Sequence, residues 1–269
     1  MQYKKIQLVE DRPEVTLEYF GNDDRSEKVD AMLVIPGGGY GCVCSDREGY
    51  PIAQAYLMQA VNAFVLHYST GDQIKNPLDP LYQASLAMIH IRENAEEYNI
   101  NPERVFCVGF SAGGHLSGSL ATLWNRADLK NLLGEKAGMN RPTGAILCYP
   151  VTLGSSGAGC AMTFKNLLKD DYANPMILDS FSLEMNVGAH SAPVFILQTF
   201  DDELVPLENA LKLGEAYGNA NIPFEMHIYP HGPHGMALAN KVTWCGREAW
   251  IDPAIAKWIE NSVYWMKKL

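Results

Sequence analysis

Residues 107–114 read Cys-Val-Gly-Phe-Ser-Ala-Gly-Gly, and this stretch joins two different patterns. The apolar run over residues 104–110 is typical of a buried strand, and the small residues that follow are spaced as in a helix. At such a strand-to-helix turn the central Ser111 adopts a strained backbone, and Gly109 and Gly113 avoid the clash that a Cβ atom would cause. A helix N-terminus behind the Ser111 hydroxyl favours developing negative charge. Ser111 is therefore a candidate nucleophile; the alternative is a serine that only caps the helix.

Length and composition are those of one globular domain. The chain has 269 residues, 47% of them hydrophobic and 19% charged, which is enough for a single α/β domain over residues 1–269. The formal net charge of −10 disfavours nucleic acid and anionic membrane surfaces as partners. No apolar run has the length of a membrane span, and residues 1–10 lack the apolar core of a signal peptide. We expect a cytoplasmic protein; its oligomeric state, including a homo-oligomer, stays open.

The six cysteines do not have the spacing of a disulfide framework or of a zinc site. Cys107 and Cys148 lie in apolar strand patterns, where cysteine usually serves as a small buried hydrophobe. Cys42 and Cys44 form a Cys-x-Cys with no second pair. We expect reduced thiols and no metal site.

Short apolar or β-branched runs recur along the chain and predict eight strands, with helical patterns between most of them. The first two runs are close enough for an antiparallel hairpin, and the later ones are nearly continuously apolar, as in parallel strands covered on both faces. The predicted strands are Ile6–Glu10, Val15–Phe20, Ala31–Pro36, Ala63–Ser69, Val105–Phe110, Ala145–Val151, Val194–Phe200 and Phe224–Pro230. Helices are predicted over residues 79–95, 112–124, 206–217 and 253–268. The fold class is α/β, with helices on both faces of a mostly parallel sheet.

Two connections interrupt this alternation. Residues 37–49 form a glycine-rich loop after the third strand. Residues 153–190 form a long connection between the sixth and seventh strands, and a connection of that length in a compact domain is usually functional. We interpret residues 153–190 as an insertion that covers the site.

An acid and a base follow the last two strands. Asp201 and Asp202 come directly after the seventh strand, and His231 and His234 come after the eighth. The carboxyl ends of parallel strands form the edge at which open α/β sheets bind ligands. Asp202 is preferred because adjacent residues leaving a strand point to opposite sides, and His234 is preferred because it lies deeper in its turn. His234 would take the Ser111 proton, and Asp202 would hold the histidine tautomer and stabilise the imidazolium.

The glycine-rich loop begins with Pro36-Gly37-Gly38-Gly39-Tyr40. Backbone without side chains can approach a substrate closely, and free amides of this loop, with that of Ala112, can bind an oxyanion. The competing interpretation is a phosphate cradle. The loop lacks the Gly-Lys-Ser/Thr ending of such a cradle.

Together these motifs resemble the α/β-hydrolase superfamily along nearly the whole chain, in the order nucleophile, acid, base. The segments similar to short-chain carboxylesterases of the acetyl-xylan esterase-like group are Pro36-Gly-Gly-Gly-Tyr40, Arg47-Glu48-Gly-Tyr-Pro51, Gly109-Phe-Ser111-Ala-Gly-Gly-His115 and Gly232-Pro-His234-Gly235. The resemblance implies the α/β-hydrolase fold and a serine esterase that releases small acyl groups, often acetyl from sugars, without cofactor or metal. It also implies Gly38, Gly39 and Ala112 as the oxyanion donors. One departure is Pro36, where hormone-sensitive-lipase-type relatives have histidine.

The leading hypothesis is a carboxylic ester hydrolase that acts on a short-chain ester of a small molecule, with acetylated saccharides as the expected substrates. Tyr40 and Arg47 are candidate substrate contacts; the alternatives are loop packing for Tyr40 and an ion pair with an acidic neighbour for Arg47. A small peptidase or amidase that uses the same three residues is a second hypothesis. A non-catalytic binding protein with a hydrolase fold is a third, disfavoured because nucleophile, acid and base are all present.

Overall fold

An eight-stranded sheet runs through the computed structural model, which describes residues 1–22, 26–154 and 157–269. Along the chain the strands are β1 (Gln2–Gln7), β2 (Thr16–Gly21), β3 (Val29–Ile35), β4 (Asn62–His67), β5 (Ile100–Phe110), β6 (Ala145–Cys148), β7 (Val194–Thr199) and β8 (Phe224–Tyr229). Their order across the sheet is β1-β2-β4-β3-β5-β6-β7-β8. The pairs β1–β2 and β2–β4 are antiparallel, and the pairs from β4 across to β8 are parallel. The predicted fold class is confirmed.

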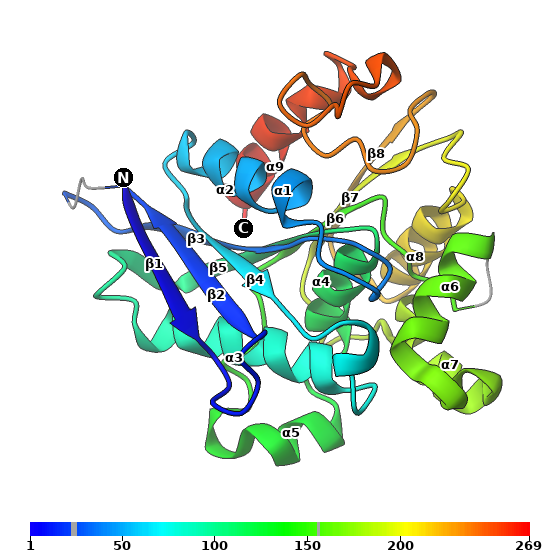
Figure 1. Cartoon of the computed structure of the whole chain (residues 1–269), viewed down its shortest axis with the longest axis horizontal. Coiled ribbons are helices and arrows are strands. Elements are labelled where there is room, and N and C mark those ends of the chain that lie inside the picture. The colour runs from blue at the N-terminus through cyan, green and yellow to red at the C-terminus, as the bar shows by residue number, and fades with distance from the viewer. Residues whose placement is uncertain (23–25, 155–156) are drawn as a thin grey trace.

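Helices cover both faces of the sheet. The α-helices are α1 (Ser45–Glu48), α2 (Tyr50–Leu57), α3 (Asp79–Glu93), α4 (Ala112–Thr122), α5 (Ala127–Leu133), α6 (Gly157–Leu168), α7 (Pro175–Phe181), α8 (Glu208–Asn219) and α9 (Trp258–Met266). The 3₁₀ helices are η1 (Gly71–Gln73), η2 (Gly134–Lys136), η3 (Lys169–Ala173), η4 (Leu183–Asn186), η5 (Glu248–Trp250) and η6 (Ile255–Lys257). In Figure 1, α2 and α9 lie above the sheet, and α3, α4 and α5 lie below it.

The two covered faces follow from the alternation of side chains along each strand. In β3, Leu33 and Ile35 belong to the core shared with α3 and α4, whereas Met32 and Val34 belong to the core shared with α2 and α9. All four side chains are fully buried. Because both faces of the strand are apolar there, residues 31–35 of β3 form a continuous apolar run rather than an alternating one.

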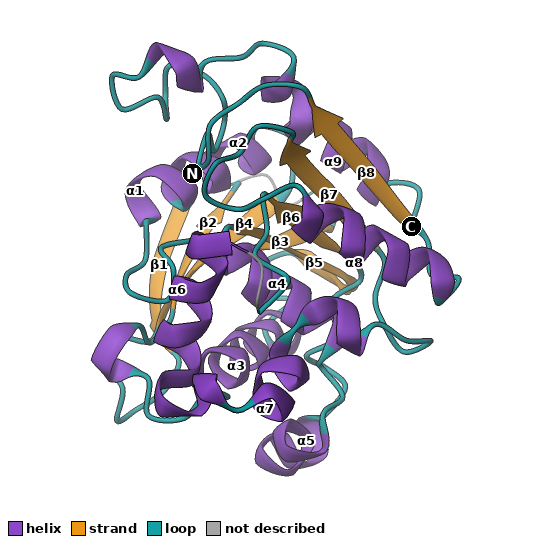
Figure 2. Cartoon of the chain, turned by 90° about the vertical axis from the view of Figure 1, so that its right-hand side faces the viewer, coloured by secondary structure: helices purple, strands orange, loops and turns teal. Residues whose placement is uncertain are grey.

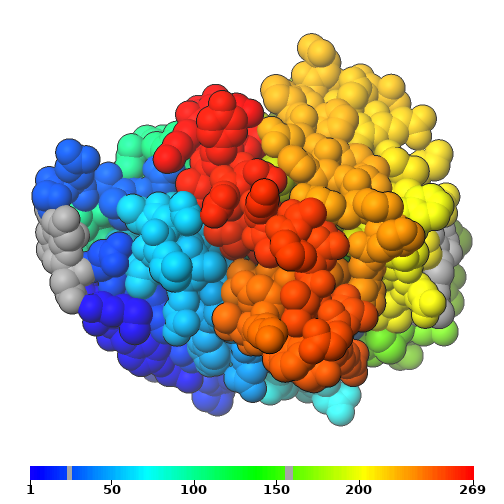
Figure 3. All heavy atoms as spheres, turned by 90° about the horizontal axis from the view of Figure 1, so that it is seen from above, coloured from blue at the N-terminus to red at the C-terminus, as the bar shows by residue number. Residues whose placement is uncertain are grey.

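Segments from the two halves of the chain meet on the α2–α9 face. The Tyr56 ring of α2 packs edge-on against Trp258 of α9, with 6.3 Å between ring centroids. A 2.9 Å hydrogen bond also joins the hydroxyls of Tyr56 and Ser262. Figure 3 views the molecule from this side and shows the light-blue α2 region beside the red C-terminal helix. This packing holds α2, and the glycine-rich loop before it, against the C-terminal part of the chain.

The position predicted for the first strand was wrong, because β1 covers Gln2–Gln7 instead of residues 6–10. Gln7 pairs with Thr16, so the residues between them form the turn of the hairpin. β1 lies at the edge of the sheet and most of its side chains are exposed, so its sequence carries no apolar run. The apolar Leu8 and Val9, which suggested a strand, lie in the turn region instead.

The predicted helices are present with small differences at their ends. The patterns over residues 79–95, 112–124 and 206–217 correspond to α3, α4 and α8. The pattern over residues 253–268 is divided between η6 and α9. Among the described residues, none of the helices is both long enough and apolar enough to cross a bilayer.

The long connection between β6 and β7 folds into helices that the sequence patterns did not indicate. It contains α6 and α7, followed by η4, which leads into the segment before β7. Figure 2 faces this side of the molecule, and α6 lies in its foreground. Residues 155 and 156 of the connection lie outside the described residues.

Glu184 in η4 is a carboxyl group in an unfavourable environment. Its Oε2 atom is buried and has no hydrogen-bond partner in the part of the chain that the structure describes. Burial, with a smaller contribution from Asp179, raises the pKa of Glu184 from 4.5 to about 7.

We expect Glu184→Gln to stabilise the protein at about pH 8 and to have little effect at about pH 4. A raised pKa in the folded state means that the stability of the wild type falls as the pH rises from about 4.5 to about 7. The variant cannot ionise and escapes this loss, which is about 1–2 kcal/mol once screening of the partly exposed group is allowed for. Thermal denaturation at both pH values measures the difference, as a rise in Tm of a few degrees at the higher pH. An equal change in Tm at both pH values would contradict this prediction.

Candidate active site

The strained turn predicted at residue 111 is present between β5 and α4. Ser111 has φ 54° and ψ −117°, in the left-handed region that side chains rarely adopt. A Cβ atom on Gly109 would lie 1.9 Å from the carbonyl oxygen of Gly113, and one on Gly113 would lie 2.1 Å from the carbonyl oxygen of Ile35. Glycine is therefore required at both positions because backbone from β3 and α4 approaches too closely for any side chain.

Three segments far apart in the sequence bring Ser111, Asp202 and His234 into direct contact. The distance from His234 Nε2 to Ser111 Oγ is 2.9 Å, and the distance from His234 Nδ1 to Asp202 Oδ2 is 2.7 Å. Because the carboxylate can only accept, Nδ1–H donates to it, which leaves Nε2 of a neutral ring free to accept the Ser111 proton. Both distances lie within the reach needed for proton transfer and for orientation of the base.

Asp202 is held by its own loop. Its side chain is fully buried, and Oδ1 accepts hydrogen bonds from the backbone amides of Leu204 and Val205, each at 2.9 Å. Two backbone donors and one imidazole donor thus satisfy a carboxylate that burial would otherwise destabilise. These bonds fix Oδ2 toward His234.

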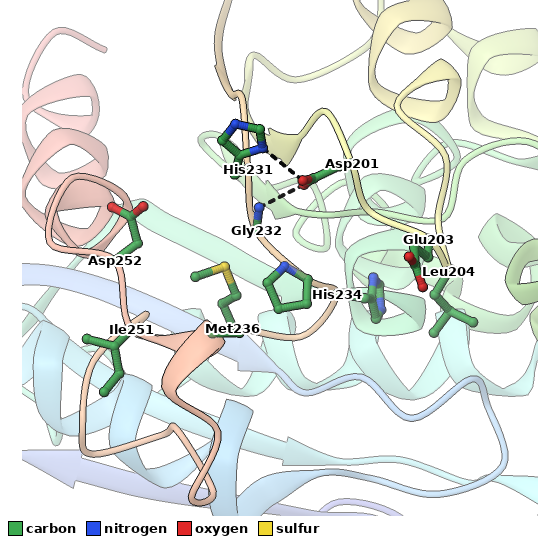
Figure 4. A pocket seen from close by; sticks show the side chains of 11 residues that line it. Asp201, Glu203, Leu204, His231, Gly232, His234, Met236, Ile251 and Asp252 are labelled. Atoms are coloured by element: carbon green, nitrogen blue, oxygen red, sulfur yellow. Dashed lines mark hydrogen bonds and ion pairs between the residues drawn. The ribbon is translucent and has the colours of Figure 1, made fainter.

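The two residues weighed against this pair contact each other instead. Asp201 accepts from His231 Nδ1 at 3.0 Å and from the backbone amide of Gly232 at 2.8 Å. Both side chains are exposed, and Figure 4 shows the pair apart from His234. The structure therefore places Asp202 against His234, as the alternation of side chains at a strand end predicts.

The glycine-rich loop lies beside Ser111. Gly38 and Gly39 have φ values of 132° and 61°, and no hydrogen bond from their amides to another described residue is present. The Asn166 side chain of α6 donates to the carbonyl oxygen of Gly39 at 2.8 Å and ties the loop to the long connection. Ala112 begins α4, and the first amides of a helix have no partner within the helix. These amides are the free donors that the sequence led us to expect near Ser111.

Two cavities share His234 in their linings. The smaller, of about 210 Å³, has a lining that includes Ser111, Gly38, Gly39, Met162, Thr163 and His234. The larger, of about 570 Å³, lies between the loops after β7 and β8 and the segment around residue 251. Figure 4 shows its lining: Leu204 and Glu203 on one side, Met236 at its base, and Ile251 and Asp252 on the far side. Leu204 and His234 border both cavities.

The prediction that Tyr40 contacts substrate is wrong for its side chain. Tyr40 is 1% exposed, and its hydroxyl lies 2.8 Å from His115 Nδ1. His115 Nε2 lies 2.9 Å from the carbonyl oxygen of Phe181, and burial lowers the pKa of His115 to about 4. The neutral ring therefore donates from Nε2 to Phe181 and accepts the Tyr40 proton at Nδ1. Tyr40 anchors the glycine-rich loop from within.

Arg47 and Glu48 lie together at the edge of the smaller cavity. Arg47 Nη2 is 3.5 Å from Glu48 Oε1, and its guanidinium lies 4.5 Å from the centre of the Trp250 ring. The ion pair that was one of the two alternatives for Arg47 is therefore present. Glu48 is almost completely buried, and no sequence pattern assigned it a role. The sequence did offer one signal for a role of Glu48, namely a carboxyl group within the glycine-rich loop that was expected beside Ser111.

Cys44 lines the smaller cavity, and the two cysteines that the sequence placed in strands lie away from it. Cys107 and Cys148 are buried within β5 and β6, as predicted. Burial raises the pKa of Cys107 to about 12, and burial with the nearby Glu48 charge raises that of Cys44 to about 11, so neither forms a reactive thiolate near neutral pH. Across residues 1–22, 26–154 and 157–269, no three His, Cys, Asp or Glu side chains are grouped as metal ligands.

Comparison with protein families identifies the group to which this arrangement belongs. Residues 17–217 match the BD-FAE family model, a span that includes Ser111 and Asp202. The chain belongs to the BD-FAE family. The solved structure of an α/β-hydrolase enzyme from a Medee basin deep-sea metagenome library is also similar, with 33% identity and a TM-score of 0.78 over 100% of this chain and 97% of that one. The resemblance to esterase-like α/β-hydrolases is thus confirmed at the level of the family and the fold.

Two curated relatives of this BD-FAE chain are larger proteins. Endo-1,4-β-xylanase B of Butyrivibrio fibrisolvens is 41% identical over 85% of the chain. An acetylxylan esterase of Xylanibacter ruminicola is 29% identical over 86% of the chain. The chain spans 35% and 45% of the lengths of these relatives, so it corresponds to part of each.

We expect Gly113→Ala to disrupt the turn at Ser111. The added methyl would overlap backbone atoms of β3, which cannot move without breaking strand pairing, and we expect a loss of about 2–4 kcal/mol of stability together with activity. Gly218→Ala in α8 is the matched control, since the nearest atom to its Cβ is 4.0 Å away and alanine favours a helix by up to about 1 kcal/mol. Urea denaturation of both variants makes the comparison; a stable, active Gly113→Ala protein would contradict it.

Proposed function

We propose that this chain is a serine hydrolase that cleaves carboxylic esters, with Ser111 as nucleophile, His234 as general base and Asp202 as the orienting acid. The observation that carries the proposal is the unbroken pair of hydrogen bonds from Ser111 through His234 to Asp202, at 2.9 and 2.7 Å. Each residue alone has a structural explanation. A serine with a strained backbone, beside a neutral imidazole and a buried carboxylate, is the arrangement that activates a hydroxyl.

The reaction follows from the positions of these groups. Ser111 Oγ attacks the acyl carbon while His234 Nε2 takes its proton, and the carbonyl oxygen gains the negative charge. The amides of Gly38, Gly39 and Ala112 donate to that oxygen, and one such donor contributes about 3–4 kcal/mol of transition-state stabilisation. His234 then returns the proton to the alcohol oxygen as the ester bond breaks and an acyl-serine remains. Water, deprotonated by the same imidazole, releases the acid.

The two cavities suggest how an ester divides between them. Because His234 must protonate the leaving oxygen, the alcohol part lies on its side of Ser111, next to the larger cavity. The 570 Å³ of that cavity is within the range of about 300–1,000 Å³ typical of ligand pockets, whereas the 210 Å³ beside the glycine-rich loop is below it. We assign the small cavity to the acyl group, which favours acetyl, and the large one to the alcohol.

An acetylated saccharide fits the larger cavity. The carboxylates of Glu203 and Asp252 can accept hydrogen bonds from sugar hydroxyls, and Met236 and Ile251 offer apolar surface to the C–H face of a ring. The similarity to an acetylxylan esterase and to a xylanase supports the same substrate class. Asp201 and His231 occupy the rim of this cavity and already satisfy each other.

We further propose that the connection over residues 153–190 covers the site within a single domain of residues 1–269. Met162 and Thr163 of α6 line the smaller cavity, and Asn166 of the same helix holds the carbonyl oxygen of Gly39. The far end of the connection contributes the Phe181 carbonyl that fixes His115. The acyl pocket is thus closed on one side by this connection.

Substitution at the three residues tests their roles. We expect Ser111→Ala to abolish labelling by a fluorophosphonate probe and to lower 4-nitrophenyl acetate turnover by about 10⁶-fold. Asp202→Asn should lower turnover by about 10⁴-fold because the histidine loses the acceptor that fixes its tautomer. Asp201→Asn is the matched control and should retain most activity. A larger loss in Asp201→Asn than in Asp202→Asn would reverse the assignment of the acid.

Acyl-chain length tests the assignment of the cavities and separates an esterase from an amidase. We expect kcat/KM for 4-nitrophenyl acetate to exceed that for the decanoate by at least about tenfold, because the longer chain has no room in the small cavity. Alanine 4-nitroanilide should be cleaved more slowly still. Preference for the decanoate would overturn the assignment of the acyl pocket, and preference for the anilide would favour the peptidase hypothesis.

A further inference from the structure

Glu48 is a buried carboxylate that the three-residue mechanism does not use. It is the last residue of α1, and 2% of its surface is exposed. A carboxyl group in such a position costs several kcal/mol of solvation unless it is hydrogen-bonded or paired. Where its hydrogen bonds go therefore indicates what the residue does.

One oxygen of Glu48 holds the start of the glycine-rich loop. Its Oε2 accepts from the backbone amide of Gly37 at 2.9 Å. Gly37 is wedged against the nucleophile turn, because a Cβ atom on it would lie 2.5 Å from the Phe110 carbonyl oxygen and 3.1 Å from Ser111 Cβ. The next amides along the chain, of Gly38 and Gly39, are the proposed oxyanion donors. The Gly37 bond therefore sets where these donors lie relative to Ser111.

The other oxygen holds the segment that carries His234. Glu48 Oε1 accepts from the Tyr149 hydroxyl at 2.9 Å, and that hydroxyl accepts from the backbone amide of Ala237 at 3.1 Å. The Tyr149 ring packs edge-on against His234, with 4.9 Å between ring centroids. Tyr149 has φ 38°, so its own backbone is constrained where β6 ends. Through Tyr149, one carboxylate supports both the imidazole ring and the chain that follows it.

Only a carboxylate can accept both of these hydrogen bonds, one at each oxygen. Gly37 N–H and the Tyr149 hydroxyl both donate to Glu48, one to each oxygen, and Arg47 supplies a third contact at 3.5 Å. A glutamine would present one acceptor oxygen and one amide group that faces a donor. An isosteric neutral side chain therefore breaks one of the two supports while filling the same volume.

We propose that Glu48 is a positioning residue that holds the oxyanion-binding loop and the His234 segment in one relative geometry, through Gly37 N–H and the Tyr149 hydroxyl. This inference rests on the proposed esterase function. A residue that only stabilises the fold affects the free energy of unfolding, whereas a positioning residue also lowers the free energy of the transition state. The alignment of donors with the developing oxyanion, and of imidazole with Ser111, matters little for substrate binding.

Glu48→Gln tests the proposal by separating kcat from KM. Misplacement of catalytic groups by about 1 Å costs about 100-fold in rate, so we expect kcat for 4-nitrophenyl acetate to fall by about 10- to 100-fold with KM changed less than about threefold. The affinity for a methylboronic acid transition-state analogue, and the rate of fluorophosphonate labelling, should fall with kcat. Activities are expressed per folded molecule, measured by near-ultraviolet circular dichroism.

Glu18→Gln is the matched control. Glu18 is likewise buried, in β2, and likewise accepts from a tyrosine hydroxyl, that of Tyr3 at 2.9 Å, but it contacts none of the proposed catalytic groups. It should lower Tm and leave kcat within about twofold, because a distant buried carboxylate affects folding alone. Equal losses of kcat per folded molecule in Glu18→Gln and Glu48→Gln would overturn the proposal, as would wild-type kcat and boronate affinity in Glu48→Gln.

Tyr149→Phe keeps the proposal testable if Glu48→Gln does not fold. Loss of the hydroxyl removes the link to Ala237 and leaves the Gly37 bond, so we expect a kcat loss of about 3- to 10-fold in this single variant. Where Glu48→Gln does fold, the loss in the double variant should be smaller than the product of the two single losses. Unchanged kcat in Tyr149→Phe would overturn the part of the proposal that runs through His234. Wild-type ester turnover and its loss in Ser111→Ala test the proposed function separately. Fluorophosphonate labelling reports on Ser111 itself. Its rate therefore compares the Glu48 variants even if the natural substrate is not an ester.

Discussion

The close approach of backbone at Gly109 and Gly113 is the constraint on which the rest of the site depends. Because neither residue has a side chain, the β5–α4 turn lies against the carbonyl oxygens of Ile35 and Pro36. In this turn Ser111 adopts a positive φ of 54°, and the glycine-rich loop lies beside it. The candidate nucleophile and the candidate oxyanion donors are thus placed by one steric requirement.

Buried carboxylates that accept backbone amides form the second layer of this arrangement. Asp202 accepts from Leu204 and Val205 and presents its remaining oxygen to His234. Glu48 accepts from Gly37 and presents its remaining oxygen to Tyr149. In each case the amides satisfy part of the charge, and the other oxygen accepts from a side chain, His234 for Asp202 and Tyr149 for Glu48. Rigid backbone thereby sets the direction of side chains that would otherwise rotate freely.

Residues at the ends of strands were predictable, and residues placed by packing were not. Ser111, Asp202 and His234 follow β5, β7 and β8, so the parallel sheet alone delivers them to one edge. Tyr40 was misjudged because a tyrosine in a loop looks the same in sequence whether its ring faces solvent or the interior. Its direction depends on His115 and on the Phe181 carbonyl, which arrive from α4 and from the long connection.

Hydrophobic periodicity and the glycines around Ser111 specified the α/β class, the strand count and the nucleophile turn, since these depend on local backbone sterics and on which faces of each strand are apolar. The choice of partner for each polar group was settled by folding. That Tyr40 meets His115, that two cavities share His234 in their linings, and that Glu48 bridges Gly37 and Tyr149 all require atoms from segments many residues apart. Such contacts leave no periodic signal, because they join single residues across the sheet edge.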